Sequence, residues 1–222
     1  MSIQITPTAF EETDGLGDWR VISEGGCIFF RTASFAESAR LAQAIAELPG
    51  IEGHPPAVDI RAAGVTIRLI SLSADYLGMT VSDVTVAQRI SAIGRELGLS
   101  ADPSGIQALL VIPGAPDIKL VMPFWRAVLG YEPRLDSPDE DLVDPLDRSA
   151  PFWFETMDEP RSDGGGSIHI SVWVPHDRAQ QRIEAALAAG GHMVRDDFAP
   201  AWWTLADAAG NEVDISTTRA RD

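Results

Sequence analysis

The stretch LPGIEGHPPAVDIRAAGVTIRL, residues 48–69, carries the change from helix to sheet in the first half of the chain. Pro49 and Gly50 stop the helical spacing of apolar residues that precedes them. Beyond them, apolar residues occupy every second position over 58–60 and again over 65–69, with a glycine between the two runs. This alternation predicts two neighbouring strands joined by a turn.

Two helices are predicted, one on each side of this strand pair. Ser34 and Glu37 have the spacing of a capping box, and apolar residues follow them at helical intervals. Thr80 and Asp83 have the same spacing at the start of a second apolar stripe. Because a carboxylate in the first turn is favoured by the helix dipole, Asp83 can serve simply as a helix cap.

Upstream of these elements, residues 19–31 predict a hairpin. Residues 19–23 form one strand, Gly25 and Gly26 form the turn, and the second strand begins at Cys27. Cys27 is the one cysteine of the chain, so no intrachain disulfide can form. A chain without disulfides fits a reducing compartment.

The composition describes an acidic globular chain. The formal net charge of the 222 residues is -16 and the pI is about 4.5. Such a charge repels nucleic acid and anionic lipid, so we expect neither as a partner. No apolar run approaches the ~18 residues of a membrane span, and the N-terminus lacks the basic and apolar regions of a secretory signal. We therefore expect a cytoplasmic protein.

The second half of the chain repeats one pattern of elements. It follows a polar stretch rich in glycine, serine and proline, which predicts a linker at 101–105. Apolar runs at 106–112 and 167–174 each precede a helical segment that ends at glycine, and short strand-like runs follow each helix. This repetition predicts two β-α-β-β-β modules.

Two features of the first module stand apart from this pattern. Pro123 lies inside the predicted helix, where it removes a backbone hydrogen bond, so we expect a kink or a late helix start. The acidic segment 136–147 is expected to be a solvated loop.

Residues 17–98 resemble the pterin-4a-carbinolamine dehydratase family. The similarity follows, in order, the segments GDWRV, FFRTASFAESARLAQAIAEL, GHPPAVDI, VTIRL and GMTVSD. It implies an antiparallel sheet with helices on one face, and a reaction that eliminates water from a 4a-hydroxytetrahydropterin. That reaction must remove the proton of ring atom N5 and protonate the departing hydroxyl, and histidine suits both tasks.

The resemblance also implies a site within the opening stretch. The family carries two adjacent histidines before the proline and a third after the next strand. Here Gly53 and His54 hold the paired positions, Ala74 holds the third, and Asp83 matches the acidic residue of the family. His54 and Asp83 are therefore the predicted catalytic residues.

The missing histidines weaken the predicted activity. Each acid or base group contributes ~10²–10⁴ in rate, so the absence of two predicts dehydratase activity that is weak or lost. Three nearby polar residues offer substitutes: Glu52, Ser73 and Asp75. The alternative is that His54, which the following proline holds extended, only binds a ligand or shapes a turn.

Residues 106–218 resemble the glyoxalase/bleomycin-resistance superfamily, also called vicinal oxygen chelate. The segments PDIKLVMPFWRAVLGYEP, SIHISVWV and WWTLADAAGNEVDIS carry the similarity. It implies a divalent metal, with Gln107, Glu155, His169 and Asp214 at the ligand positions. One imidazole, two carboxylates and an amide suit Mn, Mg, Fe, Ni or Zn. The alternative is a metal-free site in which these polar residues make interior hydrogen bonds.

These observations predict an α+β protein with a dehydratase-like domain at 1–100, a linker at 101–105 and a glyoxalase-like domain of two modules at 106–222. The predicted function is that of a 4a-hydroxytetrahydrobiopterin dehydratase-like lyase fused to a glyoxalase-like domain. Two alternatives stay open: a metal-dependent vicinal oxygen chelate enzyme with a degenerate first domain, and a non-catalytic small-molecule-binding protein. The expected ligand is pterin-like or a small oxygenated compound, and a homodimer is expected.

Overall fold

The chain folds into two compact α+β units, Met1–Ala108 and Leu109–Asp222. The computed structural model describes residues 3–22, 25–106, 111–157, 170–173, 179–216 and 220. Each unit has its own cluster of buried apolar side chains.

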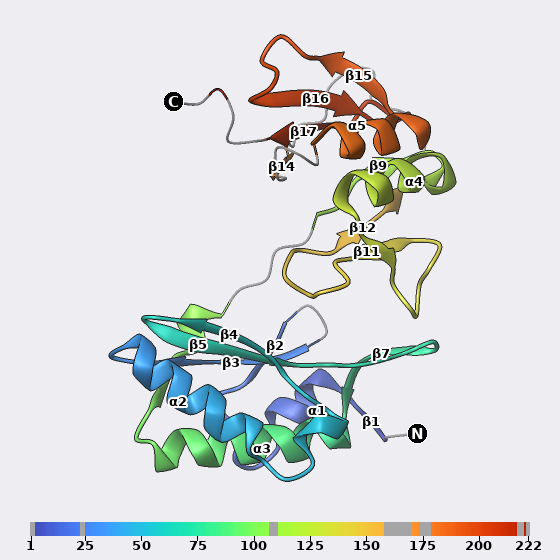
Figure 1. Cartoon of the computed structure of the whole chain (residues 1–222). Helices are drawn as coiled ribbons and strands as arrows, with labels where there is room; N and C mark the ends of the chain where they lie inside the picture. The colour runs from blue at the N-terminus through green and yellow to red at the C-terminus, as the bar shows by residue number, and fades with distance from the viewer. Residues whose placement is uncertain are drawn as a thin grey trace. The chain divides into compact units, whose positions relative to one another are not determined.

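The first unit is built on an antiparallel sheet with helices on one face. The main sheet has the order β2 (Arg20–Ile22), β3 (Gly25–Arg31), β5 (Gly64–Leu69) and β4 (Ala57–Arg61), and β8 (Ser100–Ala101) also pairs with β3. A second sheet has the order β1 (Gln4–Ile5), β7 (Tyr76–Thr80) and β6 (Ser71–Ser73). Helices α2 (Phe35–Ala46) and α3 (Val81–Glu96) lie against one face of the main sheet, and α1 (Pro7–Glu11) precedes β2 (Figure 1).

The structure confirms both predicted helix starts. The Ser34 hydroxyl accepts a hydrogen bond from the amide of Glu37 at 3.2 Å, and α2 begins at the next residue, Phe35. At α3, Thr80 and Asp83 form a reciprocal capping box. The predicted strand pair is confirmed as well, since β4 and β5 are antiparallel neighbours.

The predicted hairpin turn at Gly25 and Gly26 is wrong. Both glycines lie within β3, paired with β2, and the connection at 23–24 falls outside the described residues. A Cβ atom on Gly26 would lie 2.9 Å from the side chains of both Met79 and Phe10. Gly26 is therefore required by close packing, and not by a turn.

Residues 101–105, the predicted linker, carry local structure in the first unit. Ala101 belongs to β8, and the 3-10 helix η2 spans Pro103–Gly105. Asp102 accepts a hydrogen bond from Nε of Arg31 at 2.6 Å. The domain limits drawn from the sequence stay a prediction.

The second unit contains three small sheets and two helices among its described residues. Its first part comprises β9 (Gly114–Ala115), α4 (Ile118–Leu129), β10 (Glu132–Pro133), β11 (Asp141–Val143), β12 (Phe152–Trp153) and β13 (Glu155–Thr156). Its second part comprises β14 (Ile170–Trp173), α5 (Ala179–Ala188), β15 (His192–Arg195), β16 (Trp202–Ala206) and β17 (Glu212–Ser216). The sheet orders are β10-β11-β12, β13-β9 and β14-β17-β16-β15.

Two local expectations in the second unit need revision. Helix α4 begins after its cap Asp117 and runs through Pro123, so the proline does not delay the helix start. The acidic segment is also more than a solvated loop. Arg134 pairs with Asp136 at 2.7 Å and with Asp141 at 2.8 Å, and this ion pairing orders the segment.

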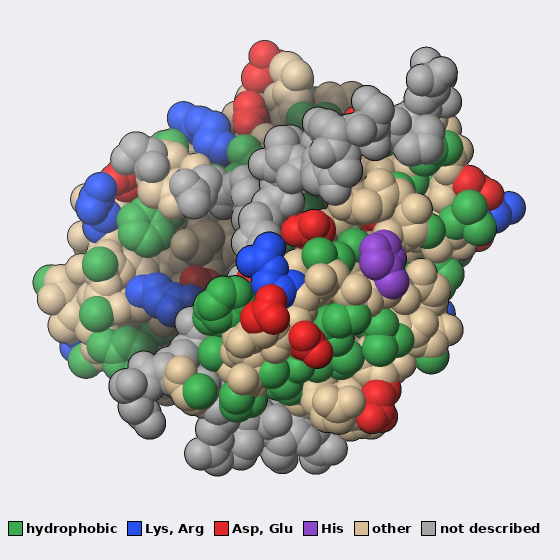
Figure 2. Space-filling model, turned by 90° about the horizontal axis from the view of Figure 1, so that it is seen from above, with side chains coloured by type: hydrophobic (Ala, Val, Ile, Leu, Met, Phe, Trp, Pro, Cys, Tyr) green, Lys and Arg blue, Asp and Glu red, His purple; other side chains and the backbone are tan. Residues whose placement is uncertain are grey.

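The surface combines charged and apolar side chains. Figure 2 shows apolar side chains next to acidic and basic ones on the face that it presents.

No helix in the described part of the chain is long and apolar enough to cross a membrane.

Candidate functional site

His54 and Asp83 come together in the first unit. Nε2 of His54 lies 2.6 Å from Oδ1 of Asp83, although 29 residues separate them in sequence. His54 follows the 3-10 helix η1 (Ile51–Gly53), and Asp83 lies in the first turn of α3. The Asp83 side chain is fully buried, whereas the His54 side chain keeps 26% of its surface exposed. The imidazole can therefore reach a ligand while its partner is shielded from water.

The second carboxylate oxygen of Asp83 also accepts hydrogen bonds. Oδ2 accepts hydrogen bonds from the backbone amide of Thr80 at 2.7 Å, from the Thr80 hydroxyl at 2.7 Å and from the Ser71 hydroxyl at 2.8 Å. The sequence pattern indicated Thr80 through the capping box. It gave no sign of Ser71, which lies on β6 and reaches Asp83 only in the folded chain.

This network assigns the tautomer of His54. An ionised carboxylate can only accept hydrogen bonds, and Asp83 accepts them at both oxygens. When Asp83 is ionised, Nε2 of His54 is the donor to Oδ1, and in the neutral ring the lone pair then lies on Nδ1. The site thus offers one basic nitrogen, held in orientation by a buried carboxylate.

Gly53 and Ala74, which hold the positions of the family's other two histidines, are both exposed. Gly53 is exposed, and a Cβ atom added there would meet nothing within 4 Å. Ala74 is exposed in the turn between β6 and β7. Neither position is closed by packing, so larger side chains can be accommodated at both.

The predicted metal ligands of the second unit are only partly described. Glu155 is exposed on β13. Asp214 lies on β17 with 9% of its surface exposed, and Oδ1 accepts a hydrogen bond from the Thr204 hydroxyl at 2.6 Å. Gln107 and His169 lie outside the described residues.

The described side chains do not by themselves form a metal site. In the described ranges, no group of three or more His, Cys, Asp or Glu side chains is placed to hold a metal ion. Asp214 lies between Val213 and Ile215, which belong to the apolar cluster of this unit. Because side chains alternate along a strand, Asp214 and Thr204 lie on the opposite face of the sheet from that cluster.

The segment DAAGNE, residues 207–212, has a structural role. Asp207 is fully buried and accepts hydrogen bonds from the amides of Ala209 and Asn211, both at 2.9 Å. Its other oxygen accepts from the indole of Trp125 at 3.0 Å. One carboxylate thus closes the turn between β16 and β17 and ties it to α4.

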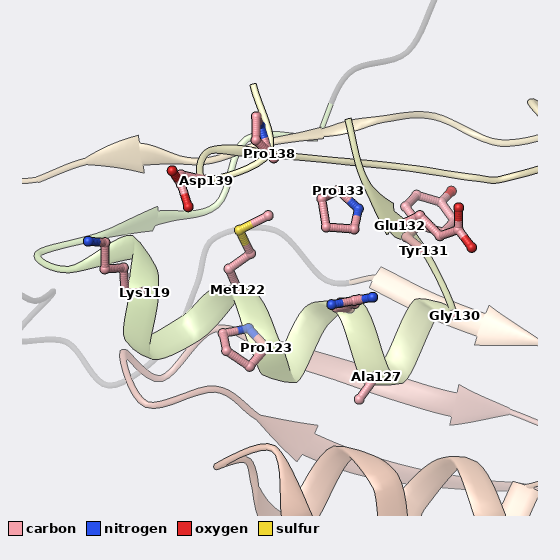
Figure 3. A pocket seen from close by; sticks show the side chains of 11 residues that line it. Lys119, Met122, Pro123, Ala127, Gly130, Tyr131, Glu132, Pro133, Pro138 and Asp139 are labelled. Atoms are coloured by element: carbon pink, nitrogen blue, oxygen red, sulfur yellow. The ribbon is translucent and has the colours of Figure 1, made fainter. Parts of the chain in front are cut away.

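A cleft of about 710 Å³ lies beside α4. One wall is a face of α4, and the other is formed by the chain that follows the helix (Figure 3). Neither Glu155 nor Asp214 lines it. Tyr131 lines it, and burial raises the pKa of its hydroxyl, which donates to the carbonyl of Ala150 at 3.0 Å. Tyr131 therefore adds no negative charge to the cleft at neutral pH.

Comparison with protein families agrees with this division of the chain. The family model described as pterin 4 alpha carbinolamine dehydratase matches residues 5–93. The model described as a glyoxalase-like domain matches residues 110–216. The protein therefore belongs to the class of two-domain α+β proteins. In particular, it is a fusion of a pterin-4a-carbinolamine dehydratase domain with a glyoxalase-like domain, as the sequence resemblances predicted.

Solved structures similar to this chain cover about half of it. A glyoxalase-related enzyme from Fulvimarina pelagi is 20% identical over 50% of this chain and 87% of its own, with a TM-score of 0.39. The fosfomycin resistance protein FosX from Mesorhizobium loti is 11% identical over 53% and 94%, with a TM-score of 0.38. A glyoxalase/dioxygenase from Nostoc punctiforme is 9% identical over 50% and 90%, with a TM-score of 0.38. No curated protein matches the chain.

Proposed function

We propose that the first domain is a slow 4a-hydroxytetrahydropterin dehydratase that works with a single histidine. The observation that carries this proposal is the 2.6 Å hydrogen bond from His54 to the buried carboxylate of Asp83. The capping box accounts for Oδ2 of Asp83, whereas Oδ1 meets the partly exposed imidazole of His54, and this second contact supports a chemical role for His54.

The proposed reaction uses one nitrogen twice. Nδ1 of His54 takes the proton from N5 of the pterin, and Asp83 stabilises the resulting imidazolium through Nε2. The same Nδ1 then returns the proton to the hydroxyl on the adjacent ring atom C4a. The C–O bond breaks, water leaves, and a double bond forms between C4a and N5, so the histidine ends as it began.

The test is a dehydration assay of the full chain with 4a-hydroxytetrahydrobiopterin. We expect a rate above the spontaneous reaction, and a loss of about a hundredfold or more of the catalysed rate in His54→Ala. A wild-type rate equal to the spontaneous one would refute the proposal, as would a His54→Ala variant with undiminished activity.

A second variant should raise the dehydration rate, whereas His54→Ala should lower it. Gly53→His places a second imidazole at an exposed position with free space around it. We expect it to raise the dehydration rate, because the two proton transfers can then be divided between two groups. Gly17→His is the matched control, since Gly17 is also exposed with no atom within 4 Å of an added Cβ. An equal rate change in both variants would contradict the proposed site.

For the glyoxalase-like domain we propose a divalent-metal site at Asp214 and Glu155, completed by Gln107 and His169. What supports it is the buried Asp214 carboxylate on the face of the sheet opposite the apolar cluster. A metal there would polarise an oxygen atom of a bound substrate. Elemental analysis after reloading the full chain should give one metal per chain, and Asp214→Ala should lose it. Equal metal content in both proteins would argue against the site.

A further inference from the structure

The cleft beside α4 has the size of a ligand-binding site. Its volume of about 710 Å³ falls within the ~300–1,000 Å³ that is typical of small-molecule pockets. It is a different place from the His54–Asp83 pair and from the Glu155 and Asp214 carboxylates, none of which lines it. Neither proposed function therefore uses it.

Two cations lie along one wall of the cleft. Lys119 and Arg126 are two turns apart on α4, roughly 10 Å along the helix axis. Both side chains are exposed, and neither forms an ion pair or hydrogen bond with any residue that the structure describes. Arg134 and Arg148 in the same unit, by contrast, are both paired with aspartates. Lys119 and Arg126 are thus available to an acidic ligand.

The space near these cations is apolar. The Met122 side chain projects from α4 toward the segment that carries Pro133 and Pro138 (Figure 3). Pro123 lacks an amide hydrogen, so the carbonyl of Lys119 has no α-helical donor and stays available as an acceptor in the same wall. The lining therefore suits a compact apolar body next to an acid group.

The numbers of positive and negative side chains in the lining favour a ligand with one negative charge over a polyanion. Glu132 and Asp139 also line the cleft, so two carboxylates oppose the two cations. Asp139 lies at the same end of the cleft as Lys119 (Figure 3). Of the two cations, Arg126 has the planar guanidinium that can form two parallel hydrogen bonds with a carboxylate, so we take Arg126 as the anion anchor. A polyanion would be repelled by both carboxylates and by the net charge of -16.

We propose that this cleft binds a small aromatic monocarboxylate. Its carboxylate forms two parallel hydrogen bonds with the guanidinium of Arg126, a geometry that lysine cannot offer. Its ring packs against Met122 and Pro133, where thioether and ring contacts are favourable.

The test is calorimetric titration of the full chain with 1-naphthoate. We expect saturable binding that Arg126→Ala weakens about tenfold or more, because a charge-assisted hydrogen bond is lost. Arg195→Ala is the matched control, since Arg195 is exposed on β15 and does not line the cleft. Neutral 1-naphthalenemethanol should bind about tenfold more weakly than 1-naphthoate, and ATP should not displace 1-naphthoate.

Several results would overturn the proposal. They are absence of 1-naphthoate binding at millimolar concentration, equal affinity of the Arg126→Ala and Arg195→Ala variants, and displacement by ATP. Circular dichroism checks that each variant is folded, and Arg126→Gln replaces Arg126→Ala if the latter is not. Because His54 does not line the cleft, His54→Ala should bind 1-naphthoate normally even if the dehydratase proposal fails.

Discussion

At the scale of single residues, the bond between His54 and Asp83 determines which imidazole nitrogen is available for chemistry. Asp83 has donors at both oxygens, and three of them come from Thr80 and Ser71. A buried carboxylate satisfied in this way cannot rotate without leaving a donor unpaired, which costs about 1–3 kcal/mol. Thr80 and Ser71 therefore help to set the orientation of His54 through their hydrogen bonds to Asp83.

The tautomer of His54 can be measured directly. In a two-bond ¹H–¹⁵N correlation spectrum, we expect neutral His54 to show the proton on Nε2, with the His54→Ala spectrum giving the assignment. Asp83→Asn should weaken this preference, because an amide offers a donor as well as an acceptor. Neutral His54 with its proton mainly on Nδ1 would contradict the network.

The contribution of Asp144 to the stability of the fold should depend on pH. Burial alone would raise its pKa, but hydrogen bonds from the Arg148 side chain and from the amides of Leu146 and Arg148 outweigh burial and lower the pKa. A lowered pKa in the folded state means that the ionised carboxylate stabilises the fold above the pKa of the unfolded chain. That contribution disappears as the pH falls through the folded pKa.

Asp144→Asn should therefore lower the free energy of unfolding at pH 7 by about 1 kcal/mol. The difference from wild type should shrink as the pH falls below about 4, near the pKa of an unfolded aspartate. Urea titrations at several pH values measure both effects. Glu140→Gln, which changes an exposed carboxyl group in the same segment, should have no comparable effect. A pH-independent difference for Asp144→Asn would contradict the assigned cause.

At the scale of elements, local signals predicted helices better than turns. Ser34 and Thr80 mark helix starts through contacts three residues away, which a sequence displays directly. Gly26 looked like a turn residue because its partners Phe10 and Met79 are distant in sequence. Ser71 was missed for the same reason. Sequence spacing alone cannot show which residues the fold brings together.

The packing role of Gly26 is open to test. Gly26→Ala would place a methyl group 2.9 Å from Met79 and from Phe10 inside the apolar cluster of the first unit. We expect a loss of about 1–3 kcal/mol in the free energy of unfolding, because these buried side chains must shift. Gly17→Ala is the control, since its Cβ meets nothing within 4 Å. Equal stability of the two variants would show that β3 tolerates the methyl group.

At the scale of the whole molecule, the chain has two separate clusters of buried apolar side chains. The described members of one cluster come from the dehydratase domain, and those of the other come from the glyoxalase-like domain. The family resemblances predicted this division, because each covers one half of the chain. The expected homodimer stays a prediction, which sedimentation equilibrium would measure.

We expect the two domains to unfold in separate steps, because a domain with its own core is stable by itself. Leu41 and Leu142 are each fully buried, one in each cluster. Each substitution should lower the unfolding free energy of its own domain by ~2–5 kcal/mol. Leu41→Ala should therefore lower the melting temperature of one transition, and Leu142→Ala that of the other. Differential scanning calorimetry makes the comparison. A single transition displaced equally by either substitution would contradict independent domains.

The Asp207 turn has a consequence for how this protein can change over evolutionary time. In the segment DAAGNE, Asp207 accepts hydrogen bonds from the amides of its own turn and from Trp125, and Asn211 donates to the carbonyl of Gly114. These contacts hold the turn between β16 and β17 and do not involve the residues that line the cleft beside α4. The ligand-facing positions can therefore diverge, by natural drift or by directed mutagenesis, while the domain still folds and is still recognised as the same kind.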